Sequence, residues 1–181
     1  ADPHRPGHEI SYYPGETNML MADVAVINKT DTAPQDGIDQ VRANIEQFAP
    51  NAVVVLAESP VTVSDVEAVK GKRVLVVEDG PTLTHGEMTF GAGAVAAEKF
   101  GAAELVDPKP FAKGSIRETY EKYPHLGPIL PAMGYSDTQR QDLAETIAAV
   151  DCDLVLLGTP IALDKVVAID RPSLRVRYGY K

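Results

Sequence analysis

Five short apolar runs, separated by segments with helical periodicity, constrain the fold of this chain more than any other feature of its sequence. The runs are residues 22–28, 51–59, 73–81, 103–110 and 152–160. The segments with helical spacing are residues 35–48, 91–102, 111–123 and 137–150. Continuous apolar strands that alternate with helices are typical of a parallel sheet with helices on both faces. The sequence therefore predicts a three-layer α/β fold with a mostly parallel sheet.

Local signals complete this prediction. Capping boxes, in which Ser or Thr precedes Glu or Gln by three residues, are expected at Thr32–Gln35, Ser64–Glu67 and Ser136–Gln139. The second of these begins a short helix that Gly71 ends. Two further short strands are predicted over residues 165–170 and 173–180. Residues 1–18 and 124–136 are rich in proline and glycine and are predicted as loops.

Composition limits the class of protein. The chain has 181 residues, 44% of them hydrophobic, which is enough for a sizeable core. A net charge of -9 argues against a nucleic-acid or anionic-membrane surface. A single cysteine suits a reducing cytoplasm, and no apolar run approaches the ~20 residues of a membrane span. Because the chain starts in the middle of a motif, without methionine, we expect a fragment of a longer protein.

A nucleotide-reading motif follows the first apolar run. Asn28, Lys29 and Asp31 form N-K-x-D, the guanine-reading motif of GTP-binding proteins. A carboxylate accepts both donors of the guanine N1–H and 2-amino edge, while a lysine stem lies along the purine face. Ala57 and Ser59 end the next apolar run, where a short loop of GTPases also contacts the base. The alternative is a plain strand end, with Asp31 or Thr32 as a helix cap.

The phosphate-binding part of such a site is absent from this sequence. No G-x-x-x-x-G-K-[ST] motif occurs, so we expect an amino-terminal portion that carries the phosphate loop. Residues 1–60 are then the end of a P-loop-like nucleotide-binding half, and residues 61–181 are the carboxyl-terminal part of a single α/β unit.

The opening loop supplies polar groups for this site. Asp2 is the candidate Mg²⁺ ligand, in the position of the aspartate that ends a strand in P-loop proteins. His4, Arg5 and His8 are candidates for contact with phosphate oxygens. Zinc is disfavoured, because Pro6 and Gly7 prevent helical spacing of the two histidines. The alternative is an exposed, proline-rich tail.

A second polar loop follows the third run, over residues 78–93. Glu78 and Asp79 end the run, and a glycine-led helix begins near Gly91. Backbone N–H groups at such a helix start can hold a phosphate or a carboxylate. Candidate substrate-binding residues are Arg5, Thr82, Thr84, His85 and Gly86. His85 is also a candidate catalytic residue that donates to the anion or moves a proton. The alternative is a surface turn.

The longer motifs resemble one family. They are "DPHRPGHE", "YYPGETN", "ADVAVINKTDTA", "VEDGPTLTHGEMTFGAG" and "DLVLLGTPIAL". Together they resemble the carboxyl-terminal part of the cyclic 2,3-diphosphoglycerate synthetase family, whose members are often described as predicted GTPases. The resemblance implies an ATP-dependent ligase that forms an intramolecular phosphoanhydride, with ATP or GTP and Mg²⁺ as cofactors.

Three functions agree with these observations. In the favoured one, Asp2-bound magnesium with His4, Arg5, His8 and His85 screens two substrate phosphates from each other and aligns the attack. The second is a GTPase switch, which needs no second phosphorylated ligand. The third is a non-catalytic fragment. The expected partners are a nucleotide, a phosphorylated small molecule and the missing amino-terminal portion, with a homodimer as a further option.

Overall fold

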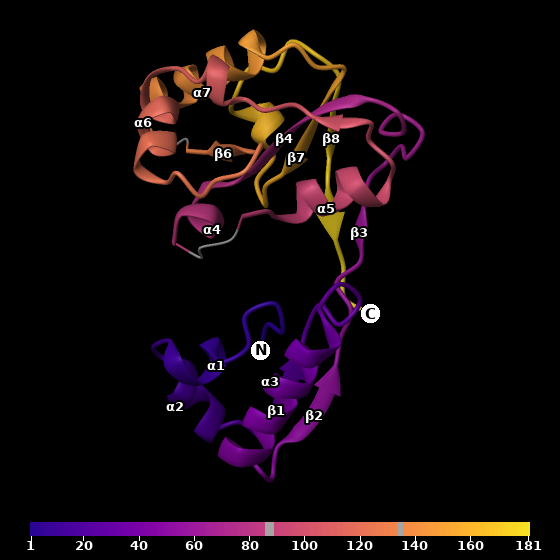
Figure 1. Ribbon diagram of the computed structural model, residues 1–181, viewed down its shortest axis with the longest axis vertical. Helices are drawn as coiled ribbons and strands as arrows, with labels where there is room; N and C mark the ends of the chain where they lie inside the picture. Colours follow the sequence, from indigo (N-terminus) through magenta and orange to yellow (C-terminus); the bar gives the residue numbers. More distant parts are fainter. Residues whose placement is uncertain (86–88, 134–135) are drawn as a thin grey trace. The chain divides into compact units, whose positions relative to one another are not determined.

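The chain separates into two compact units. Unit 1 consists of Ala1–Pro60 and Tyr178–Lys181, and unit 2 consists of Val61–Arg177. In the computed structural model (Figure 1), residues 1–85, 89–133 and 136–181 are described, apart from the side chains of Pro81, Thr82 and His85.

Unit 1 is a small parallel sheet with helices on one face. Strands β1 (Val24–Ile27) and β2 (Val53–Leu56) pair in parallel, in the register Val24↔Val53 to Ile27↔Leu56. Helix α3 (Gln35–Phe48) connects them, and the short helices α1 (His8–Ser11) and α2 (Gly15–Leu20) precede β1. The unit core joins Met19, Ala25, Ile27, Ile38, Val41, Ile45 and Ala49. Both the α1–α2 segment and α3 therefore pack on the face that carries Ile27 (Figure 1).

Unit 2 contains a sheet of five parallel-paired strands among the described residues. β4 (Arg73–Asp79) lies at its centre, between β7 (Leu154–Gly158) on one edge and β5 (Glu104–Leu105) and β6 (Leu130–Ala132) on the other. β8 (Ser173–Arg175) pairs with β7. The helices are α4 (Gly80–His85), α5 (Ala92–Lys99), α6 (Gly114–Lys122) and α7 (Asp137–Ala149), with short 3₁₀ turns at Lys109–Phe111 and Leu163–Lys165. The short strands β3 (Val61–Thr62) and β9 (Arg177–Tyr178) pair with each other.

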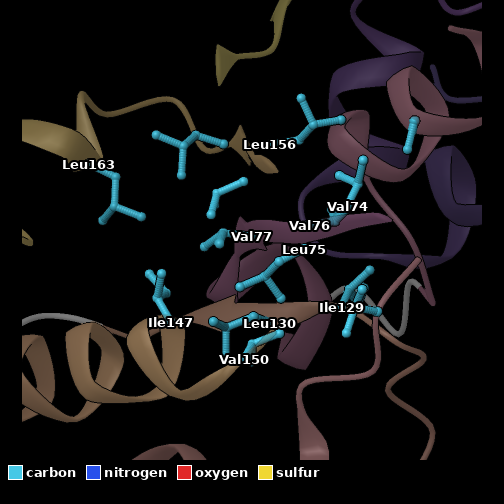
Figure 2. Close-up of a cluster of buried hydrophobic side chains, with 14 of the residues drawn as sticks. Val74, Leu75, Val76, Val77, Ile129, Leu130, Ile147, Val150, Leu156 and Leu163 are labelled. Atoms are coloured by element: carbon cyan, nitrogen blue, oxygen red, sulfur yellow. The ribbon is translucent and has the colours of Figure 1, made fainter. Parts of the chain in front are cut away.

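The core of unit 2 explains why β4 is a continuous apolar run. Its residues Val74–Val77 are all fully buried, because the strand has neighbours on both edges and side chains packed on both faces. Figure 2 shows these valines and Leu75 among side chains of β6, β7 and α7, including Leu130, Leu156 and Ile147. This confirms the prediction of an α/β fold built on a mostly parallel sheet.

Several local predictions hold and others are wrong. The helix predicted over 35–48 is α3, and the capping box at Ser136 and Gln139 is present at the start of α7. No helix occurs over 64–70 and no strand over 165–170. The predicted loop over 1–18 contains α1 and the start of α2, and the predicted loop over 124–136 contains β6. The capping box expected at Thr32 is absent, since α3 begins after Pro34 without a side-chain cap.

Within the described ranges, each helix is too short or too polar to cross a lipid bilayer.

Candidate functional site

The N-K-x-D residues form a corner of unit 1 that joins the loops after β1 and β2. The Asp31 Oδ1 atom accepts the Ser59 backbone N–H at 2.9 Å, and the Ser59 hydroxyl donates to Asn28 Oδ1 at 3.4 Å. The Thr30 N–H donates to the Ala57 carbonyl at 3.1 Å. Because the two strands are parallel neighbours, both loops leave the same edge of the sheet. Asp31 is exposed and caps no helix, so its carboxylate is accessible to a ligand.

The opening loop lies against this corner. The Asp2 carboxylate accepts hydrogen bonds from Lys29 Nζ at 2.8 Å and Arg5 Nη2 at 2.9 Å, and from the His4 backbone N–H at 3.1 Å. The His4 ring nitrogen Nε2 is 3.0 Å from Thr32 Oγ1. The expected proximity of the histidine–arginine loop and the N-K-x-D corner is therefore confirmed. Its part in ligand binding stays a prediction.

Electrostatics fix the protonation state of Asp2. Partial burial by itself raises the pKa of the carboxyl group, but the hydrogen bond and charge of Lys29, together with Arg5, outweigh this effect. The pKa of Asp2 is therefore lowered, and the carboxylate is ionised at neutral pH. Lys29 takes a left-handed backbone conformation, with φ of 60°, which turns the chain so that its side chain faces Asp2.

Backbone contacts hold the opening loop in place. The Ala1 amino group donates to the Val26 carbonyl at 2.6 Å, and the Asn28 N–H donates to the Ala1 carbonyl at 3.1 Å. Pro3 is buried against α3, where a Cβ on Gly37 would overlap the Pro3 carbonyl oxygen. The close approach requires glycine at this helix position.

The side chains around Asp2 do not by themselves form a magnesium site. Both carboxylate oxygens already accept hydrogen bonds. The Oδ2 atom accepts from the cationic side chains of Lys29 and Arg5, and the Oδ1 atom accepts the His4 backbone N–H. No group of three His, Cys, Asp or Glu side chains suited to a metal occurs among the described residues. His8 opens α1, and the centroid of its ring lies 4.4 Å from the centroid of the Tyr12 ring.

Unit 2 contains a buried acid that the sequence analysis placed only at a strand end. Glu78 lies near the carboxyl end of β4 and is 2% exposed. Its Oε1 accepts the Ala94 N–H at 3.0 Å, in the first turn of α5. Burial raises the pKa of Glu78 to about 7, against the opposing effect of the Ala94, Gly93 and Gly91 N–H groups. The helix start that was expected to hold a ligand anion therefore holds the carboxylate of Glu78.

Glycines make room for this carboxylate. A Cβ on Gly91, Gly93 or Gly158 would meet the Glu78 carboxyl group or its immediate surroundings. Gly91 and Gly93 lie at the start of α5, whereas Gly158 ends β7, so the two segments meet around the Glu78 carboxyl group only in the fold. Glycine at a helix start and at a strand end was the signal that could have indicated a close backbone approach.

The remaining predicted site residues of unit 2 have separate outcomes. Thr84 is buried, and its hydroxyl donates to the Gly80 carbonyl within α4 at 2.9 Å; its part in substrate binding stays a prediction. Gly86 and the side chains of Thr82 and His85 lie outside the described part of the chain. A cavity of about 450 Å³ next to α5, lined by residues including Phe90, Glu98 and Leu105, contains none of the predicted site residues.

Comparison with known proteins gives one curated relative. The chain is 60% identical over 178 residues to arginine synthetase ArcE of Thermococcus kodakarensis. The alignment takes in 98% of the chain and 40% of that relative, so the chain spans well under half of the relative's length. No protein-family model matches the chain. The relative's name does not mention cyclic 2,3-diphosphoglycerate, and synthesis of that compound stays a prediction.

Proposed function

We propose that this chain is part of an NTP-dependent ligase and that the N-K-x-D corner of unit 1 holds the nucleotide base. The observation that carries the proposal is the corner itself. Asn28, Asp31 and Ser59 come from the loops that follow the neighbouring strands β1 and β2, and hydrogen bonds join them at one sheet edge. This edge is where α/β sheets bind ligands.

The chemistry of the corner favours a base with two adjacent donors. Asp31 keeps one oxygen engaged with the Ser59 N–H, which fixes the orientation of the carboxylate. The exposed carboxylate then accepts hydrogen bonds from the base edge. Guanine offers such donors and adenine does not, so the corner supports GTP over ATP.

The relative supports a ligase as the reaction class. Its name states that it is a synthetase of arginine, and it is 60% identical to nearly the whole of this chain. We favour arginine as the product of the longer protein, formed from a precursor with oxygen in place of one guanidinium nitrogen. The NTP γ-phosphoryl group is transferred to that oxygen and NDP is released. A nitrogen nucleophile then attacks the carbon and loses a proton, and the oxygen leaves as part of inorganic phosphate.

The motif resemblance supports a second product, cyclic 2,3-diphosphoglycerate. Here the NTP activates one substrate phosphate, the neighbouring phosphate attacks it, and NDP and phosphate are released. In both reactions Arg5 and His4 of the opening loop stabilise anionic oxygens. We propose that Mg²⁺ binds with the nucleotide as a cofactor; the described residues do not by themselves form a site for it.

The test is nucleotide binding and turnover by the longer, gene-encoded protein that contains this chain. Asp31→Asn keeps the oxygen that accepts the Ser59 N–H and removes the charge that the guanine edge requires. Because a hydrogen bond to a charged group contributes ~1.5–3 kcal/mol, we expect GTP affinity to fall roughly 10- to 150-fold, with little change for ATP.

Asp39→Asn, at an exposed position of α3, is the matched control and should change neither affinity. Equal losses for the two nucleotides, or none, would remove the corner as a base site. Turnover is measured with each precursor. Arginine formation supports the favoured product, cyclic diphosphoglycerate formation supports the second, and GTP hydrolysis without either product supports the switch.

A further inference from the structure

Unit 1 has one face of its parallel sheet covered and the other bare. Ala25 and Ile27 of β1 are buried against α3 and α2. Their neighbours in the strand alternate to the opposite face, where Val24 is 56% exposed and Val26 is 41% exposed. The register pairs these two residues with Val53 and Val55 of β2, which are 62% and 41% exposed. Four adjacent β-branched side chains, hereafter the valine face, thus form one exposed apolar surface.

Both connections within unit 1 lie on the covered face. The α1–α2 segment contributes Met19 and Ile10 to the core around Ile27, and α3 contributes Ile38 and Val41 to the same core. No helix of unit 1 therefore packs on the valine face. Parallel sheets are covered on both faces, because their crossover connections place helices there.

On the edge of β1 that faces away from β2, Ala1 begins a parallel pairing. Ala1 donates to the Val26 carbonyl and accepts from the Asn28 N–H, which is the bonding pattern of a parallel strand with Ala1 opposite Ile27. The backbone of Asp23 and Ile27 instead bonds β2. The Val24 and Val26 N–H groups therefore point to the edge that Ala1 occupies.

We propose that an αβ segment on the amino-terminal side of Ala1, a helix followed by a strand that leads into Ala1, docks on unit 1 in the longer protein. Its strand extends the Ala1 pairing along Val24 and Val26, parallel to β1, and an apolar helix face covers the valine face. In a two-fold symmetric dimer, β1 of a second copy would pair antiparallel with this edge, whereas the pairing that Ala1 begins is parallel. The part of the relative that this chain does not match is large enough to supply the segment.

Amide exchange tests the edge without any substitution. In the 181-residue chain, we expect the Val24 and Val26 amides to exchange rapidly and the Ile27 amide, which faces β2, to exchange slowly. In the longer, gene-encoded protein the Val24 and Val26 amides should slow by at least about 100-fold, whereas equal rapid exchange in both forms overturns the strand.

Thiol labelling tests the face. In a Cys152→Ser background, Val26→Cys and Val53→Cys should react rapidly with a maleimide in the 181-residue chain and at least about 10-fold more slowly in the longer protein. Glu46→Cys, on the exposed side of α3, is the matched control and should react rapidly in both. Unchanged labelling in the longer protein overturns the proposal. Slow labelling already in the 181-residue chain also overturns the proposal. If the slowing depends on protein concentration, a second copy covers the valine face; if it does not, unit 2 covers it.

Discussion

The buried carboxyl group of Glu78 makes the stability of unit 2 depend on pH. Its pKa in the fold is about 7, against an ordinary value of 4.5. Below pH 4.5 the group is neutral in both the folded and the unfolded chain. Above pH 7 it is ionised in both, and the folded chain must keep the charge buried. Between these values the folded chain binds more protons, so the free energy of unfolding falls as pH rises.

The size of the effect follows from the gap between the two pKa values. About 2.5 pKa units at ~1.36 kcal/mol each give roughly 3 kcal/mol lost between pH 4.5 and pH 8. Glu78→Gln keeps the shape of the side chain and cannot ionise. Its amide also changes the bonding to the Ala94 N–H, but that contribution does not vary with pH. As pH rises from 4.5 to 8, the unfolding free energy of the variant should therefore increase relative to that of the wild type by roughly 3 kcal/mol.

The assay is urea unfolding followed by far-ultraviolet circular dichroism, from pH 4.5 to pH 8, for both proteins. Taking the difference removes the titration of every other group that the two proteins share. Glu98→Gln, at an exposed position of the same α5 helix, is the matched control and should give a difference that does not change with pH. A flat difference for Glu78→Gln would refute the assignment of a buried, proton-binding carboxyl group at this position.

Three further outcomes test unit 1. Gly37→Ala should destabilise the chain and expose the amino-terminal loop to proteolysis, because the added Cβ meets Pro3. If the variant instead gains roughly 0.5–1 kcal/mol of unfolding free energy in urea, which is normal for Gly→Ala in a helix, the loop is not docked there. Lys29→Ala and Lys29→Gly both lose the ion pair with Asp2, but only alanine strains the left-handed backbone at this position. The alanine variant should therefore be less stable than the glycine variant by about 1 kcal/mol in the same assay, and equal stabilities would contradict that strain. Arg5→Ala in the longer protein should lower kcat by roughly 30- to 900-fold, the equivalent of ~2–4 kcal/mol, while the unfolding midpoint changes little; unchanged kcat would remove the opening loop from the reaction.

The features that the sequence alone determined are those set by neighbours in the chain. Helix α3 spans the predicted 35–48, because its apolar periodicity is local and Pro34 precedes its first turn. The Ser136 cap likewise depends on only four consecutive residues, 136–139. The continuous apolar run of β4 predicted a strand with both faces buried, and β4 is the central strand of the sheet. The N-K-x-D corner was found from residue order, since its residues lie within four positions of one another.

Other features depend on residues that are distant in sequence and meet only in the fold. The predicted helix over 64–70 and strand over 165–170 had suitable local patterns, but residues 64–70 adopt turns and 165–170 pair with no strand. β6 lies in a proline-rich segment, and only its pairing with β4 makes it a strand. Glu78 was predicted only to end a strand, yet three glycines from two other segments enclose its carboxyl group. The pair between Asp2 and Lys29 spans 27 residues, and its existence depends on the docking of the opening loop beside β1. Local pattern fixes which backbone conformations are favourable, whereas burial, pKa and pairing depend on what the fold brings within a few ångströms.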